Sequence, residues 1–150
     1  MKDCYSVGEM ARVGNCQVQT VRYYEKIGIL PKAQRSAGNQ RIYTASHIDR
    51  LKFIRHSREL GFSLDQIREI LAISDNPDHS CQEVDQIARS HLLEVESKIS
   101  RLNDMRIELK RMVTQCSGGQ VATCRIIEIL SDHSLCLSKT HSPETSIREK

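Results

Sequence analysis

The chain has 150 residues, a net charge of +3 and an apolar content of 39%, which suits one compact domain or a small domain with an elongated appendage. No apolar run approaches the roughly 20 residues that cross a bilayer, and no signal peptide precedes Ser6, so we expect a cytoplasmic protein without membrane contact. Six cysteines in a reducing compartment favour metal ligation or thiol chemistry over disulfides.

Basic residues are concentrated in the first half of the chain. Residues 1–70 carry 12 Lys and Arg against 7 Asp and Glu, a balance of +5, and residues 71–150 carry 10 against 12, a balance of −2. A surface that binds phosphates needs such a basic excess.

Two short helices joined by a tight turn are predicted near the N-terminus. Ser6 followed by Glu9 is a capping box that begins a helix over residues 6–12, and a second helix is expected over residues 18–27. The pair is a helix-turn-helix candidate, although an ordinary surface helix would fit the second segment equally well. Its exposed face carries side chains that can contact phosphates or bases, namely Gln19, Thr20, Arg22, Tyr23 and Lys26.

A β-hairpin is predicted over residues 35–43, with Gly38 and Asn39 at its tip. Such a hairpin beside a helix-turn-helix is a wing. It would place Arg35 and Arg41 near the backbone of a DNA duplex.

Two further helices complete the predicted DNA-binding half. A third helix is expected to begin after Thr44 or Ser46 and to run to Leu60, and a fourth begins at Ser63. A break rich in Asp, Asn and Pro follows, so we expect the DNA-binding domain to occupy residues 1–75.

One long helix is predicted over residues 81–115, which contain neither Gly nor Pro. Alternating steps of four and three separate the positions of a coiled-coil seam, which are Ala88, Leu92, Val95, Ile99, Leu102, Arg106, Leu109 and Val113. Little chain remains to cover this narrow stripe by packing within one domain. We therefore expect the helix to pair with a second copy of the chain.

Three cysteines lie at the two ends of this helix. Cys81 and Cys116 are 116 − 81 = 35 residues apart, which is about 52 Å along a helix, whereas Cys124 closes a short loop with Cys116. The three thiols therefore cannot meet within one chain. An antiparallel pair of chains would bring Cys81 of one copy to the loop of the other, which predicts a metal site at the dimer interface.

The motifs resemble those of the mercury-resistance-regulator (MerR) family of transcription activators. The resemblance covers the first 71 residues in order and at the family's spacing, and the long helix and cysteine loop extend it to about residue 130. The matching segments are Ser-Val-Gly-Glu-Met-Ala (6–11), Thr-Val-Arg-Tyr-Tyr-Glu (20–25), Gly-Ile-Leu-Pro (28–31), Gly-Asn-Gln-Arg-Ile-Tyr (38–43), Leu-Lys-Phe-Ile-Arg (51–55) and Gly-Phe-Ser-Leu-Asp-Gln-Ile-Arg-Glu-Ile-Leu (61–71).

The resemblance implies a mainly α fold. A winged helix-turn-helix DNA-binding domain with a small β wing (residues 1–75) would be followed by a long antiparallel coiled-coil dimerisation helix (81–115), a metal-binding loop with a short helix (116–132) and a flexible tail (133–150). It also implies DNA contacts from the recognition helix, the wing and the third helix, carried by Arg22 and Tyr23, by Arg35, Arg41 and Tyr43, and by Lys52 and Arg55.

The implied function is that of a regulator and not of an enzyme. A homodimer would bind double-stranded promoter DNA across an over-long spacer, repress without metal and activate with it. It would act on RNA polymerase indirectly, by distorting the DNA. Metal resistance or efflux genes are the expected targets.

The resemblance is greatest to sensors of divalent heavy metals, because those sensors place a cysteine where Cys81 stands. Three thiolates carry −3 and suit a soft divalent cation: cadmium, lead, mercury or zinc. Zinc prefers a fourth ligand, and the loop between Cys116 and Cys124 contains no other Cys or His, which favours the first three. His79 is one candidate for that ligand, and Cys136 with His133 and His141 is a candidate second site in the tail.

Two other sensing chemistries stay open on the sequence. Cys116 and Cys124 alone would suit copper(I), or they would form a disulfide switch. No Cys–His or paired-carboxylate arrangement indicates an enzyme. The effector metal, the role of Cys16 and the target promoter are left undecided.

Overall fold

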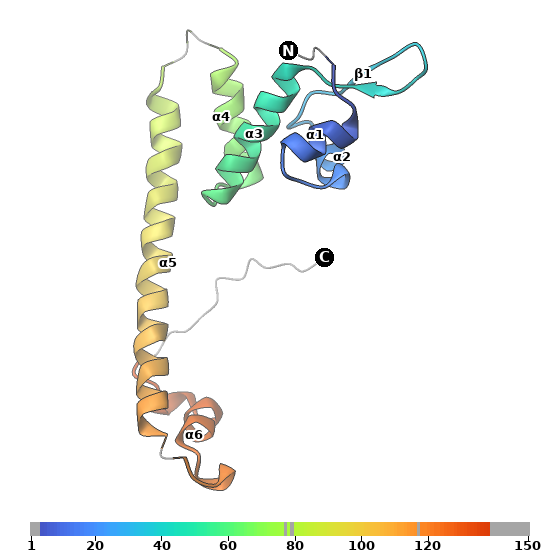
Figure 1. Cartoon of the computed structure of the whole chain (residues 1–150). Coiled ribbons are helices and arrows are strands. Elements are labelled where there is room, and N and C mark those ends of the chain that lie inside the picture. Colours follow the sequence, from blue (N-terminus) through green and yellow to red (C-terminus); the bar gives the residue numbers. More distant parts are fainter. Residues whose placement is uncertain (1–3, 77, 79, 117, 139–150) are drawn as a thin grey trace. The chain divides into compact units, whose positions relative to one another are not determined.

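The structure is a computed structural model that describes residues 4–76, 78, 80–116 and 118–138. The chain divides into two compact units, Met1–Ala88 and Arg89–Lys150, and the division falls within the longest helix. The elements of the described residues are α1 (Val7–Val13), α2 (Val18–Lys26), β1 (Gln34–Arg35), β2 (Arg41–Ile42), α3 (Ala45–Glu59), α4 (Leu64–Ser74), α5 (Gln82–Gln115), α6 (Arg125–Ser131) and two single-turn 3₁₀ helices, η1 (Val121–Thr123) and η2 (His133–Leu135) (Figure 1).

The helix-turn-helix consists of α1 and α2, as the sequence predicts. Ser6 and Glu9 form the expected capping box, in which each side chain accepts a hydrogen bond from the backbone N–H of the other residue. The turn needs a glycine at position 14, because a Cβ there would lie 2.3 Å from Cδ2 of Leu51, a fully buried side chain. The turn therefore packs directly against α3.

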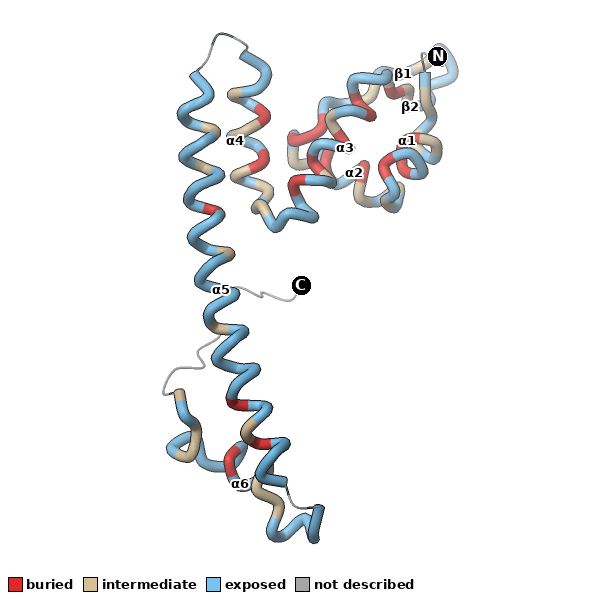
Figure 2. The backbone as a smooth tube through the Cα atoms, turned by 60° about the vertical axis from the view of Figure 1, so that its left-hand side comes forward, coloured by how far each residue is buried: buried red, intermediate tan, exposed pale blue. Residues whose placement is uncertain are grey.

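The core of the first unit lies between α1, α2, α3 and α4, and Figure 2 marks buried stretches in red on each of these helices. Capping boxes at Thr44 and Ser63 begin α3 and α4. Arg50 joins the two helices, since its guanidinium donates to both carboxylate oxygens of Asp75 at 2.7–2.9 Å. The core is formed by Met10, Ala11, Val21, Tyr24, Ile29, Leu30, Tyr43, Ile48, Leu51, Ile54, Ile67 and Leu71.

The wing is a two-stranded antiparallel sheet in which Gln34 pairs with Ile42 and Arg35 with Arg41. Asn39 occupies the left-handed region at its tip, with φ = 62°. One addition to the predicted hairpin is a bridge between Tyr5 and Tyr43, whose backbone N–H and C=O groups exchange two hydrogen bonds of 2.8 and 2.9 Å. The segment before α1 therefore anchors the base of the wing.

The second unit is built on the C-terminal part of α5. Met112 and Ile129 are buried where α6 meets α5, whereas most of α5 is exposed (Figure 2). The exposed positions include most of the predicted seam, with Leu92, Ile99, Leu102, Leu109 and Val113 each more than half accessible. Within the part of the chain that the structure describes, no helix is both long and apolar enough to cross a membrane.

The segment after α6 differs from the predicted flexible tail over its first residues. The backbone of residues 133–135 forms η2, and Arg111 of α5 donates to the carbonyl oxygen of Leu135 at 2.6 Å. Glu108, also on α5, accepts from the N–H of Leu137 at 3.0 Å and from Arg111. Two buried or half-buried polar side chains therefore hold this segment against α5, which sequence patterning did not reveal.

Candidate DNA-binding surface and metal-binding loop

The recognition-helix side chains predicted to contact DNA lie on the outer face of α2. Gln19, Arg22 and Tyr23 are exposed, and Thr20 is half-buried. Val21 and Tyr24 occupy the opposite face and are buried in the core. The helix is held in the core on one side and presents polar and cationic groups on the other. Contacts with DNA bases and phosphates need this arrangement.

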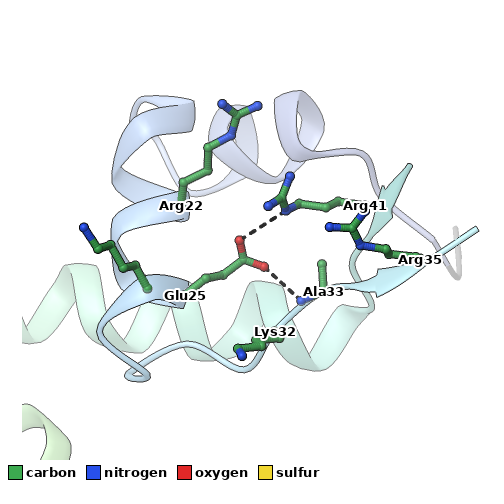
Figure 3. Close-up of a pocket in the computed structure, with 7 residues that line it drawn as sticks. Arg22, Glu25, Lys32, Ala33, Arg35 and Arg41 are labelled. Carbon is green, nitrogen blue, oxygen red and sulfur yellow. Dashed lines mark hydrogen bonds and ion pairs between the residues drawn. The ribbon is translucent and has the colours of Figure 1, made fainter. Parts of the chain in front are cut away.

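A basic pocket lies between α2 and the wing (Figure 3). Its rim combines the recognition helix with both strands, so the predicted contacts Arg22, Arg35 and Arg41 are brought together. Arg35 also donates to the side chain of Asn39 at the tip of the wing, at 2.5 Å. The pocket is lined by Arg22, Glu25, Lys26, Lys32, Ala33, Arg35 and Arg41.

Tyr43 does not occupy the surface position expected of a wing contact. Its side chain is 0% exposed and belongs to the core, where its ring lies edge-on to His47 with 5.6 Å between ring centroids. Burial, and next the charge of Glu25, raise the pKa of Tyr43 to about 12, so the hydroxyl stays protonated. Because the Tyr5 bridge and the core hold it inside, Tyr43 supports the wing and offers DNA no exposed side chain.

The two predicted phosphate contacts of α3 differ in their surroundings. Lys52 is exposed, whereas Arg55 is half-buried and lies 3.4 Å from the carboxylate of Glu59. Arg55 is also close to Cys16, where its charge lowers the thiol pKa against the larger, opposing effect of burial, which leaves that pKa raised. Cys16 packs against the core, which suits a structural residue better than a reactive one.

The two loop cysteines lie side by side. Cys124 is the N-cap of α6, where its sulfur lies near the backbone N–H groups of Ile127 and Ile126 and near the thiol of Cys116. These donors lower the pKa of the Cys124 thiol, because they stabilise the thiolate. A thiolate is the form that binds a metal, so the local backbone prepares one ligand and places a second beside it.

Short contacts close the loop between α5 and α6. Gly118 adopts a left-handed φ of 66°, and Arg125 donates to the side-chain oxygen of Gln115 at 3.5 Å. A cavity of about 90 Å³ lies in this loop, where Gly118, Arg125 and both cysteines are among the residues that line it. Ligand sites for organic molecules are usually several times larger, so the space suits an ion.

The remaining predicted ligands do not join this pair. Cys81 is exposed at the start of α5, and its carbonyl oxygen accepts from the N–H of Asp85. His133 is exposed and Cys136 is half-buried in the η2 segment. Among the residues that the structure describes, no group of three or more Cys, His, Asp or Glu side chains could hold a metal within one chain. His79 and His141 lie outside the described residues.

Glu25 and Glu108 are buried acids that sequence reasoning did not single out. Their side chains are 9% and 5% exposed. Glu25 follows Val18 and Val21 at helical spacing, so the periodicity of α2 could have predicted that Glu25 lies on its buried face. Glu108 lies off the predicted seam, and no pattern in the sequence marks it.

Comparison with known proteins identifies both parts of the chain. The protein-family model described as "MerR HTH family regulatory protein" matches residues 5–73, and the family model described as "MerR, DNA binding" matches residues 48–112. The transcriptional regulator ZntR of Escherichia coli (strain K12) is 43% identical over 129 residues, which cover 84% of this chain and 92% of ZntR.

Two solved structures of metal complexes share the fold. One is the transcription regulator PbrR691 from Ralstonia metallidurans CH34 with lead(II), at 36% identity and a TM-score of 0.74, covering 84% of this chain and 98% of that one. The other is the regulator MerR of Bacillus megaterium MB1 with mercury(II), at 26% identity and a TM-score of 0.62, covering 85% and 100%.

Proposed function

This chain belongs to the MerR family of transcription regulators, and we propose that it is a homodimeric sensor of a soft divalent metal. It would bind promoter DNA and switch from repressor to activator when the metal binds. The observation that carries the proposal is the pair of adjacent thiols, Cys116 and Cys124, with the pKa of Cys124 lowered by backbone donors. An enzyme needs a reactive group in a cleft, whereas this pair lies in a space suited to an ion.

The DNA-binding part of the proposal is supported by the exposed cations around α2 and the wing. Arg22, Arg35 and Arg41 surround one pocket, and Lys52 lies on the neighbouring helix α3. Several phosphate contacts of this kind make the affinity for DNA fall steeply with salt. Gln19 and Tyr23 are the candidates for contacts with bases.

Dimerisation is supported by the apolar seam of α5. Leu102, Met105, Leu109 and Val113 line an apolar groove, and each is at least 46% exposed. An isolated chain would leave this area in water, at a cost of roughly 25 cal/mol for each Å². A second α5 in antiparallel orientation would cover the groove and bring its own Cys81 toward Cys116 and Cys124.

The proposed site therefore combines thiols from two chains. A helix of 34 residues is about 51 Å long, which separates Cys81 from the loop cysteines that follow its far end. Three thiolates suit cadmium(II), lead(II) or mercury(II), and His133 or Cys136 are candidate further ligands for zinc(II). PbrR691 with lead(II) and the Bacillus regulator with mercury(II), both similar to this chain, support a metal effector without deciding which metal it is.

Ordering of the loop would link the effector to the DNA. Cys124 caps α6, whose Ile129 is buried while Ile127 and Leu130 are exposed. Fixing Cys124 would fix the start of α6, and its exposed apolar side chains would then pack on the partner's helix. A full switch requires the two states of the dimer to differ about 10⁴-fold in affinity for the effector.

The test is a titration of the reduced, oxygen-free protein with cadmium(II), lead(II), mercury(II), zinc(II) and copper(I), followed by thiolate-to-metal absorption. Cys81→Ser should weaken divalent binding strongly and abolish metal-induced transcription, yet leave DNA binding intact. Cys4→Ser, which removes another exposed cysteine, is the matched control and should behave as wild type.

Other results would select the alternatives. Tight copper(I) binding that does not depend on Cys81 would indicate a monovalent sensor that uses Cys116 and Cys124. If no ion binds tightly, a disulfide switch between these two cysteines becomes the better explanation.

A further inference from the structure

Among the residues that the structure describes, Glu25 is the one acidic residue that lines the basic pocket, where it lies among Arg22, Lys26, Lys32, Arg35 and Arg41. Its side chain is 9% exposed. A carboxylate at this surface opposes DNA binding by its charge, and its burial is costly unless it is paired and hydrogen-bonded. Its presence therefore needs a reason other than direct contact with DNA.

The contacts of Glu25 join the recognition helix to the wing (Figure 3). Its Oε1 accepts a hydrogen bond of 2.9 Å from the N–H of Ala33, and its Oε2 lies 3.7 Å from Nε of Arg41. Ala33 immediately precedes β1, and Arg41 begins β2. One side chain of α2 thus contacts the residue that leads into β1 and the residue that begins β2.

The surroundings of Glu25 make this link a rigid one. Tyr43, whose hydroxyl is close enough to Glu25 to feel its charge, is fully buried and tied through its backbone to Tyr5. On the helix side, Val21 and Tyr24 anchor α2 in the core. The carboxylate therefore connects α2 with the wing, and both are anchored in the core. These two elements also carry the cationic side chains Arg22, Arg35 and Arg41 at the rim of the pocket.

This inference rests on the proposed DNA-binding function. We propose that Glu25 is a positioning residue that fixes the wing relative to α2, so that Arg22 and Arg41 reach a duplex at one separation. Charge alone attracts any duplex, whereas a fixed separation of cations favours a duplex of one shape and groove width. Glu25 thereby determines the preference for the operator over other DNA.

The test compares the wild type with Glu25→Gln on two duplexes of equal length. One is selected by the wild-type protein from a randomised pool, and the other is its shuffled counterpart. Fluorescence anisotropy over a range of salt concentrations gives both affinities. Asp49→Asn removes the same charge from an exposed position on α3 and is the matched control.

Glu25→Gln should lower the preference for the selected duplex by about tenfold or more. Affinity for the shuffled duplex should stay the same or rise, because a negative charge has been removed. Asp49→Asn should shift both affinities by one common factor. If Glu25→Gln also shifts both by one factor, its role is electrostatic or structural only and the proposal is overturned.

Folding and the proposed function have separate readouts. Circular dichroism and thermal unfolding report whether Glu25→Gln folds. If it does not, Glu25→Asp keeps the charge but is one methylene shorter, and it should lower the preference in the same way. A wild-type protein that selects no preferred duplex would overturn the proposed function and this inference with it.

Discussion

Cys124 shows how one residue can serve both the backbone and the proposed chemistry. As N-cap of α6 it places its sulfur near the backbone N–H donors of Ile127 and Ile126, in the first turn of the helix. The same donors lower the pKa of its thiol, because they stabilise the negative sulfur. The fold therefore favours the thiolate form of Cys124 in the metal-free protein.

This arrangement predicts the pH dependence of Cys124 alkylation. In the folded, metal-free protein the reaction with iodoacetamide should titrate at a pH below the thiol's ordinary 9.0, because the thiolate is the reacting form. Mass spectrometry of labelled peptides measures it site by site. In denaturant the same thiol should titrate near its ordinary value; a folded midpoint at or above that value would contradict the prediction.

Among single residues, some roles expected from the sequence agree with the structure and others do not. The capping box of Ser6 and Glu9 was predicted correctly because all of its partners lie within four residues. The family resemblance implies Tyr43 as a DNA contact of the wing, but its side chain is buried, and its backbone forms a bridge with Tyr5, 38 positions away (43 − 5). Local patterns reveal local partners, and this partner is remote.

At the scale of elements, the contact between α5 and the η2 segment was not predicted. Glu108 is buried, accepts from the N–H of Leu137 and is paired with Arg111, which also donates to Leu135. The segment lies beside the end of α5 from which the cysteine loop begins. Its attachment therefore bears on whether Cys136 is held near that end.

Replacing Glu108 with Ala should release this segment. The change removes the acceptor of the Leu137 N–H and the partner of Arg111, which should lower the free energy of local opening by roughly 1–3 kcal/mol. Hydrogen exchange at the Leu137 amide measures that opening. Glu96→Ala, at an exposed position of the same helix, should leave the amide unchanged.

If both variants show equal exchange, the contact with Glu108 does not hold the segment. A titration of Glu108→Ala with the metal would measure whether the loss of this contact also changes the affinity for the metal. A lower affinity there would connect the attachment to the proposed site, through His133 or Cys136.

At the scale of the whole molecule, the exposed seam of α5 is the main feature still without a partner in a single chain. Leu102, Leu109 and Val113 are 57–67% exposed, although a heptad pattern selects them for burial. A symmetric dimer uses the same patch twice, so each substitution in the seam acts twice.

Leu109→Asp should therefore weaken self-association. Burying a leucine is worth about 1.5–3 kcal/mol, and the loss counts in both copies, so the dimer dissociation constant should rise by about 100-fold or more. Sedimentation equilibrium measures it. Ile107→Asp is the matched control, since Ile107 is also exposed on α5 but lies off the seam. Equal association of both variants and wild type would exclude the seam as an interface.

By itself the sequence determined the order and type of the elements of the DNA-binding half. Its helix caps, the turn at Gly14 and the hairpin tip at Asn39 are short-range features, and the structure contains all of them. It also marked Cys116 and Cys124 as a pair, because only seven residues separate them. Periodicity was enough to predict α5 and to select the seam that it leaves exposed.

Only the tertiary structure decided which polar side chains are buried and what they hold. Glu25 joins α2 to the wing, Tyr43 supports that wing from inside, and Glu108 ties residues 135–137 to α5. Each role depends on a hydrogen-bond partner or packing neighbour that is remote in sequence. Burial of a charged or polar group is tolerated only where the fold supplies that partner, and no local pattern of residues contains it.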